Sequence, residues 1–365
     1  MQRTFANSLD SLKRDWISPP GHTIANLLEE RNWTQAQLAD RLGVSRKHVN
    51  ELITGKATIS DANAIKLARV LGSTVGFWLN REAGYRAALA DQQAIEQLRD
   101  DVSWLDELPV SHMRKMGWIR SYRDKAKTVS ECLQFFGVGS VDTWRSWSAG
   151  LGQTAYRMSD SANRAFGSIA TWLRFGEIQA STLECEDYSK EVFKTSLASL
   201  RALTLEPDPD VFVPQLQELC ADSGIAVVFE PTPRGCPASG ATRWIAPNKA
   251  LLMLSLRYKT NDHLWFTFFH EAAHILLHRK KLMFLELNQN GNGEEEVEAN
   301  QFAADLLIPS QHLDLLRTLA NNRAEVRQFA RKLGIPPGIV VGRMQYEGIL
   351  PHGQLNDLKV KYAWA

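Results

Sequence analysis

Three residues in the C-terminal half of the chain have the types and the spacing of a catalytic metal site. His270, Glu271 and His274 form the pattern H-E-x-x-H within the apolar segment 265–277. On a helix this spacing places both imidazoles on one face, one turn apart, with the carboxylate beside them. Two imidazoles and one carboxylate are a common ligand set of catalytic zinc. We therefore expect a Zn²⁺ site with His270 and His274 as ligands and Glu271 as general base.

The remaining ligand has to come from a second helix, which the apolar spacing of residues 294–309 predicts. Glu296 shares a face of that helix with Ala299 and Asn300, and the small residues of this face allow close approach to the first helix. Glu298 lies on a different face. We therefore expect Glu296, rather than Glu298, to be the third ligand, and Asn300 to orient a ligand histidine through a hydrogen bond.

Two alternatives stay open around this motif. The first is a buried helix whose histidines only satisfy hydrogen bonds. The second concerns His278, which lies one turn beyond His274 but is displaced around the helix. We expect His278 to support a ligand or to be exposed, because a fourth protein ligand would close the site and make it structural.

Strand patterns precede the metal motif. Residues 224–231 form an unbroken, β-branched run, and 238–244 and 249–256 indicate two further strands around a turn. We expect residues 238–245 to be an edge strand that holds a substrate backbone by strand addition. Arg243 on this strand either stabilises an oxyanion or pairs with a surface carboxylate, and we favour the pairing.

The residues of this C-terminal region carry a resemblance. The segment HEAAHILLH, followed by E-x-E-A-N-x-F-A-A-x-x-L-I-P, resembles the ImmA/IrrE family of metallopeptidase domains over about residues 216–345. Members of that family act in bacteria as proteases directed at repressor proteins. The resemblance implies zinc bound by His270, His274 and Glu296, with Glu271 catalytic.

The N-terminal region contains the pattern of two short helices joined by a tight turn, at residues 34–56. Thr34 can cap the first helix, with Gln37 completing a capping box. Gly43 ends that helix, and Ser45 can cap the next. This arrangement is the helix-turn-helix signature.

The second of these helices has a polar face suited to DNA. Arg46 and Lys47 suit guanine or phosphate, and Asn50 suits adenine, whereas Val49 and Leu52 face inward. The alternative is a small helical domain with a solvated basic face.

From about residue 20 to 85 the chain resembles the XRE-type helix-turn-helix of HigA-like antitoxins. The shared features are P-G, W-T-Q-x-x-L-A-x-x-L-G-V-S-R, I-T-G-K and the closing G-F-W-L-N. The resemblance implies binding to a double-stranded DNA operator, usually as a homodimer. Its base-contacting positions correspond to Gln35, Ser45, Arg46, Lys47 and Asn50. We expect Lys56, just past the second helix, to contact phosphate.

Composition limits the classes of protein. The chain has 365 residues and a formal net charge of +1, so a basic surface must be local. The four scattered cysteines indicate reduced thiols rather than a disulfide framework. We find neither a signal peptide nor an apolar run long enough to span a membrane, and we expect a cytoplasmic protein without a membrane partner.

We expect a mainly α fold with a small β-sheet, in three parts. These are an all-α helix-turn-helix domain at 1–86, a helical connector or dimerisation region at 87–210 and an α+β, zincin-like domain at 211–365. A linker is expected at 206–210. The frequent tryptophans of the middle part indicate core or helix interfaces.

The zincin-like part also contains an echo of the helix-turn-helix. Residues 329–345 repeat the spacing of residues 38–54, with Gly334 at the position of Gly43. The second copy has Pro336, Pro337 and Gly338 where the first has its polar residues, so it offers no side-chain donors to bases. We expect it to be a packing element.

Two functions agree with these features. In the first, a zinc endopeptidase is joined to an operator-binding domain and cleaves a repressor or antitoxin in a stress-response, phage or toxin–antitoxin context. In the second, the chain is an antitoxin-like transcription repressor whose zincin domain is a sensor without proteolysis. The complete H-E-x-x-H favours the first, and the fusion to a DNA-binding domain favours the second.

Overall fold

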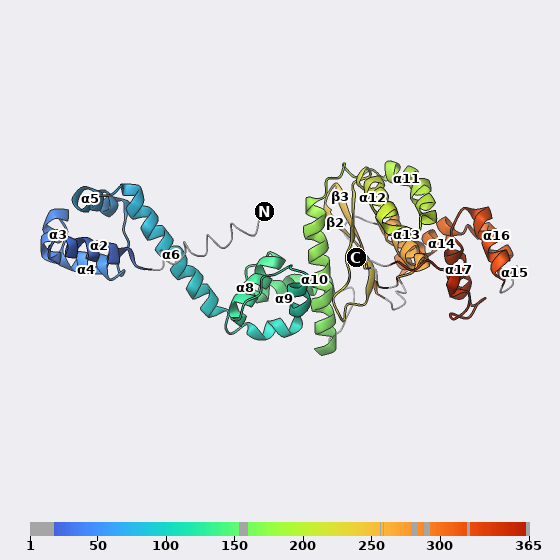
Figure 1. The fold of residues 1–365 in the computed structure, drawn as a ribbon, viewed down its shortest axis with the longest axis horizontal. Coiled ribbons are helices and arrows are strands. Elements are labelled where there is room, and N and C mark those ends of the chain that lie inside the picture. Colours follow the sequence, from blue (N-terminus) through green and yellow to red (C-terminus); the bar gives the residue numbers. More distant parts are fainter. Residues whose placement is uncertain are drawn as a thin grey trace. The chain divides into compact units, whose positions relative to one another are not determined.

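A computed structural model describes residues 18–152, 160–255, 257, 259–278, 284–287, 293–319 and 322–362. The chain forms two compact units. One reaches to Val102 and includes Asp124–Ser130, and the other comprises Ser103–Arg123 and the chain from Glu131 onward. The elements confirm a mainly α fold with one small β-sheet (Figure 1).

The first unit is a bundle of short helices. They are α2 (Pro20–Glu30), α3 (Gln35–Leu42), α4 (Arg46–Ile53) and α5 (Asp61–Leu71), followed by the longer α6 (Val75–Gln97). Each helix contributes to one apolar core, which includes Ile24, Leu38, Val49, Leu67 and Trp78. Burial of one apolar stripe per helix is what holds such short helices together.

Side-chain caps determine where α3 and α4 begin and end. The Thr34 hydroxyl accepts a hydrogen bond from the Gln37 amide at 3.2 Å, and the Gln37 side chain accepts one from the Thr34 amide at 2.8 Å. Gly43 ends α3 in the left-handed region, with φ of 61°. Ser45 then accepts a hydrogen bond from the His48 amide at 3.1 Å and begins α4. The capping box and the turn predicted from the sequence are confirmed.

The helices that follow are rich in buried aromatic side chains. They are α7 (Val110–Lys115), α8 (Lys125–Phe136), α9 (Val141–Gly152) and α10 (Asp160–Thr182), after the 3₁₀ turn Val102–Glu107. The rings of Trp104 and Trp144 meet edge to face at 5.2 Å, and both are buried, as is Trp172. These tryptophans are core residues, as their frequency predicted.

The sheet of the second unit has four strands in the order β1-β3-β2-β4. Their bounds are β1 (Ile225–Phe229), β2 (Ala238–Ala246), β3 (Lys249–Leu254) and β4 (Phe284–Leu287). β1 is parallel to β3, and β2 is antiparallel to both β3 and β4. The expectation that residues 238–245 form an edge strand was wrong, because β4, which comes after the metal helix in sequence, covers that edge.

Helices pack on both faces of this sheet. Trp172 of α10 packs with Ala226 and Leu251, whereas Trp265 of α13 (Asn261–Leu277) packs with Val227 and Leu252. Neighbouring strand residues point to opposite faces, so α10 and α13 lie on opposite sides (Figure 1). The remaining helices are α11 (Lys190–Ala202), α12 (Pro209–Ala221), α14 (Glu294–Leu307), α15 (Leu313–Thr318), α16 (Arg323–Leu333) and α17 (Pro337–Tyr346), with 3₁₀ turns at Leu203–Leu205, Ser310–His312 and Asn356–Leu358.

Two features bear on the expected domain limits. Helix α6 runs without interruption through residue 86, and Phe193 and Leu200 of α11 belong to the same core as the metal helix. The core of the C-terminal part therefore begins before residue 211, and the limits of the three parts stay predictions. Among the described residues, no helix combines the length and the apolar character needed to cross a membrane.

Residues 329–345, which repeat the spacing of the helix-turn-helix, also have its backbone geometry. Gly334 between α16 and α17 has φ of 65° and ψ of 43°, close to the 61° and 47° of Gly43. Yet α17 is buried through Ile339, Val340 and Met344 in the core around α13. It is a packing element, as expected.

Candidate metal centre and nucleic-acid interface

The metal motif lies on a helix that is buried almost all round. Within α13, the exposed fractions of His270, Glu271 and His274 are 1%, 0% and 1%. Aromatic neighbours on the same helix, Trp265, Phe268 and Phe269, fill the core behind them. The polar residues therefore turn away from that core toward α14 and β2.

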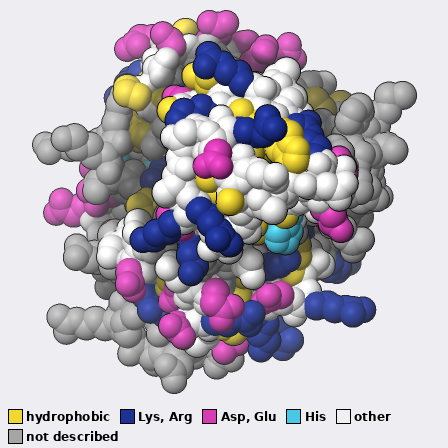
Figure 2. Space-filling model, turned by 90° about the vertical axis from the view of Figure 1, so that its left-hand side faces the viewer, with side chains coloured by type: hydrophobic (Ala, Val, Ile, Leu, Met, Phe, Trp, Pro, Cys, Tyr) yellow, Lys and Arg dark blue, Asp and Glu magenta, His cyan; other side chains and the backbone are white. Residues whose placement is uncertain are grey.

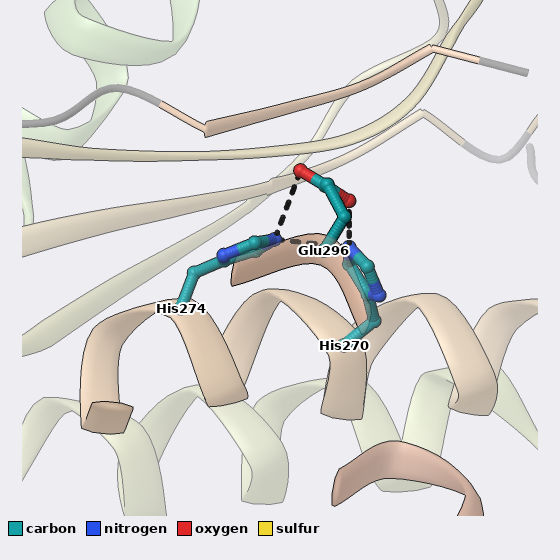
Figure 3. A group of neighbouring side chains, drawn as sticks. All are labelled: His270, His274 and Glu296. Atoms are coloured by element: carbon teal, nitrogen blue, oxygen red, sulfur yellow. Dashed lines mark hydrogen bonds and ion pairs between the residues drawn. The ribbon is translucent and has the colours of Figure 1, made fainter. Parts of the chain in front are cut away.

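The two imidazoles and one carboxylate converge on a single point (Figure 3). The Nε2 atoms of His270 and His274 are 3.0 Å apart. The Glu296 carboxylate of α14 reaches both, with Oε2 3.2 Å from His270 Nε2 and Oε1 3.5 Å from His274 Nε2. One atom from each residue lies within 4.8 Å of the others, which is the arrangement of a possible metal site.

The chemistry of these donors fits zinc. Burial, and then the neighbouring histidines His270 and His278, lower the pKa of His274 to about 2. Its imidazole is therefore neutral at pH 7, which is the form that binds metal. Two neutral imidazoles with one carboxylate match the three protein ligands of a catalytic zinc site, in which water takes the fourth coordination position.

The helix α14 also places the other two predicted residues. Asn300 Oδ1 lies 3.0 Å from His270 Nδ1, so it accepts a hydrogen bond from the ring nitrogen that faces away from the cluster. Glu298 is outside the cluster, and its carboxylate lies 3.3 Å from His278 Nε2. The face of the helix that carries Glu296, Ala299 and Asn300 is thus the one directed at α13.

β2 holds the Glu271 side chain in place. Its Oε2 accepts a hydrogen bond from the Thr242 hydroxyl at 2.5 Å. Gly240 lies so close that an added Cβ would stand 2.6 Å from Glu271 Oε1. Neither Thr242 nor Gly240 was predicted as a site residue from the sequence. A glycine inside a strand pattern was the available signal, because it often marks a close approach by another group.

Arg243 is engaged away from the metal cluster. Its guanidinium forms an ion pair with Glu177 of α10, and it lies 5.9 Å from the ring of Trp147. The pairing with a carboxylate that the sequence favoured is therefore present, although Glu177 is largely buried rather than on the surface.

The predicted DNA-contacting residues lie on and around α4. Ser45, Arg46, Lys47, Asn50 and Lys56 are exposed, and Gln35 at the start of α3 is half-buried. In the view of Figure 2, exposed Lys and Arg side chains are mixed with those of Asp and Glu. This agrees with a small net charge and local basic positions.

Of two side-chain contacts made by α4, the first follows from helical spacing, and the second, to α5, could not be predicted from that spacing. Lys47 Nζ lies 3.9 Å from Glu51, one turn later. His48 Nε2 lies 3.0 Å from the side-chain amide of Asn63 on α5. The second contact fixes a ring on the same helix as Arg46 and Asn50, and links α4 to α5.

The fold and the two sites define a class: a helix-turn-helix DNA-binding domain joined to an H-E-x-x-H metallopeptidase-type domain. Residues 24–78 match the Helix-turn-helix family, and residues 220–345 match the IrrE N-terminal-like domain. The chain is 33% identical over 73 residues to the uncharacterized HTH-type transcriptional regulator YddM of Escherichia coli (strain K12), which covers 20% of this chain and 78% of that protein. The chain belongs to the XRE-type helix-turn-helix regulators and carries an ImmA/IrrE-like domain.

Proposed function

We propose that this regulator carries a working zinc endopeptidase, with His270, His274 and Glu296 as the metal ligands. The observation that supports this most is the convergence of three ligand atoms on the same helix pair as the buried Glu271 carboxylate, which accepts a hydrogen bond from Thr242. The chemistry that zinc supplies when bound is Lewis-acid polarisation of the scissile carbonyl and acidification of the attacking water.

Glu271 has the position of a general base. Its carboxylate can take a proton from the attacking water and later deliver it to the nitrogen of the leaving amine. The hydrogen bond from Thr242 keeps the carboxylate in one orientation, and Gly240 leaves it the space to occupy. Asn300 holds the ring of His270, so that its Nε2 faces the cluster.

The DNA-binding part of the proposal assigns base contacts to Gln35, Ser45, Arg46, Lys47 and Asn50, and a phosphate contact to Lys56. The exposure of Ser45, Arg46 and Lys47 at the N-terminal end of α4 supports this, because that end enters the major groove in helix-turn-helix proteins. One module neutralises few phosphates, so we propose that the protein binds its operator as a homodimer.

We further propose that the substrate is a repressor or antitoxin protein, in a stress-response, phage or toxin–antitoxin context, and that the protein works in the cytoplasm. The experiment that tests this pairs metal analysis of the purified protein with a cleavage assay on the products of neighbouring genes. Zinc at one equivalent together with cleavage that a chelator abolishes is the expected result. Zinc binding without cleavage of any of these proteins would favour the second function, a metal-dependent sensor that regulates transcription.

A further inference from the structure

The ring nitrogens that face away from the cluster are held differently in the two histidines. His270 Nδ1 meets the Asn300 amide oxygen, whereas His274 Nδ1 lies 2.9 Å from Nδ1 of His278. His278 comes one turn after His274, at the end of α13, and its side chain is only 5% exposed. Its other nitrogen, Nε2, lies 3.3 Å from Glu298 Oε2.

Proton positions follow from these distances. A histidine that offers Nε2 to a metal carries its hydrogen on Nδ1, so His274 donates from Nδ1 and His278 accepts on Nδ1. A neutral His278 then carries its own hydrogen on Nε2, where the Glu298 carboxylate can accept it. The contact from His274 to His278 and the contact from His278 to Glu298 then each join one donor to one acceptor. In both, the donor is the residue nearer the cluster.

We infer that His278 is a positioning residue for the metal site: it accepts the hydrogen bond that fixes the tautomer and the ring orientation of His274. The inference rests on the proposed zinc site. His278 itself does not act as a ligand, because its two ring nitrogens face His274 Nδ1 and Glu298 rather than the cluster. Asn300 and His278 thus have parallel roles, one for each histidine.

Glu298 contributes much less to this arrangement than His278. Its side chain is 64% exposed, so water screens its charge and can replace it as the acceptor. His278 is enclosed, and removing its acceptor would take away the 2.9 Å hydrogen bond that the buried His274 makes through Nδ1. Groups that hold a metal-bound histidine typically change metal affinity by about 10- to 100-fold when they are removed.

The test measures the affinity of the full-length protein for Zn²⁺, by competition with a chelator, and the visible absorption of the protein loaded with Co²⁺. His278→Phe keeps the ring and removes the acceptor, and we expect it to weaken zinc binding by about 10- to 100-fold and to alter the Co²⁺ spectrum. His278→Asn restores an acceptor close to the position of Nδ1, and should recover most of the affinity. Glu298→Gln should change it by less than about threefold.

Controls separate positioning from folding. His312→Phe removes another histidine of the same unit, and should leave zinc affinity unchanged. Metal-free His278→Phe should still unfold in a cooperative transition, with a Tm lower by about a few degrees because a buried hydrogen bond is lost, and metal-free His278→Asn should unfold like the wild type.

Three outcomes would overturn the inference. Wild-type affinity in His278→Phe would show that His274 needs no such acceptor, and equal losses in His278→Phe and His278→Asn would show that the hydrogen bond is not the cause. Either of these two outcomes is compatible with the proposed zinc site, provided that the wild type binds zinc and His270→Ala does not. A wild-type protein that binds no zinc would remove the proposed function together with this inference.

Discussion

The two functional helices of this protein place their polar residues in opposite surroundings. On α4, Arg46, Lys47 and Asn50 are exposed, and only Val49 and Leu52 are buried. On α13 the functional residues are enclosed, and they contact one another and residues of α14 and β2. We therefore expect each substitution on α4 to remove a single contact with DNA. A substitution around α13 should instead disturb several residues of the metal site together.

The comparison with the second helix-turn-helix sharpens this difference. Helices α16 and α17 join through the same left-handed glycine turn as α3 and α4, yet α17 is buried and lacks polar groups on the corresponding positions. The backbone motif alone does not define a DNA-reading helix. What distinguishes α4 is that its polar residues are left exposed.

The largest effect is expected from Glu271→Gln. Loss of a general base typically costs about 10²- to 10⁴-fold in rate, so cleavage of the natural substrate should fall by that factor. Zinc content and operator affinity should stay at wild-type values, because Glu271 is not a ligand in this proposal and the helix-turn-helix lies in the other unit. Cleavage kinetics, metal analysis and gel-shift titration check the three parts.

His270→Ala is the matched variant that also removes a ligand. A Glu271→Gln protein that regulates a reporter like the wild type, beside a defective His270→Ala, would favour the sensor over the protease. If both variants fail in the reporter while both still bind the operator, proteolysis is the working activity.

Next in size is the contrast between Glu296→Gln and Glu298→Gln. Removal of one of three ligands should weaken zinc binding by more than the roughly 10- to 100-fold typical of supporting groups, whereas Glu298 lies outside the cluster. Zinc occupancy after mild chelation is the measurement. The opposite order of metal loss would transfer the ligand role to Glu298.

Gly240→Ala, a substitution on β2, should displace the Glu271 carboxylate and lower the rate of cleavage. The new methyl group would stand 2.6 Å from Glu271 Oε1, so the carboxylate has to move, and a displacement of about 1 Å can cost about 10²-fold in rate. Zinc content should change little. Gly353→Ala, where an added Cβ meets nothing within 4 Å, is the control. Equal cleavage rates in both variants would argue against the role given to Glu271.

A smaller and more local effect is expected on α4. Arg46→Ala or Asn50→Ala should each cost about 1 to 3 kcal/mol at the cognate operator and relax specificity there. Gel-shift titration against the protein's own upstream region measures this, with Arg69→Ala on α5 as a control for loss of one positive charge. Unchanged affinity in both α4 variants would mean that another surface reads the DNA.

The smallest effect concerns stability and pH. Burial raises the pKa of Glu230, which directly follows β1, to about 7. The folded protein binds the proton of the Glu230 carboxyl more tightly than the unfolded chain does. The contribution of this proton to the free energy of unfolding is therefore complete at low pH and is lost as pH rises toward 7. Glu230→Gln should therefore raise the free energy of unfolding by on the order of 1 to 2 kcal/mol at pH 8, and by little at pH 4. Urea unfolding at both pH values checks this, and an equal gain at both would contradict it.

Local signals in the sequence predicted much of the fold. The capping residues Thr34, Gln37 and Ser45 and the turn at Gly43 needed only near neighbours, and the structure confirms them. β1, β2 and β3 also formed where the strand patterns predicted them, whereas β4 was not predicted. The order of the strands could not be predicted in this way, because β4 pairs with β2 although the whole of α13 separates the two strands in the sequence.

The sequence by itself determined which residues share a helix face, since helical spacing is a property of the backbone. This was enough to group His270 with His274, and Glu296 with Asn300. Only the tertiary structure decided which groups meet across elements: Thr242 and Gly240 at Glu271, Glu177 at Arg243, and Glu298 at His278. The physical reason is that such contacts depend on how whole elements pack, and packing is set by the burial of apolar faces that many distant residues supply.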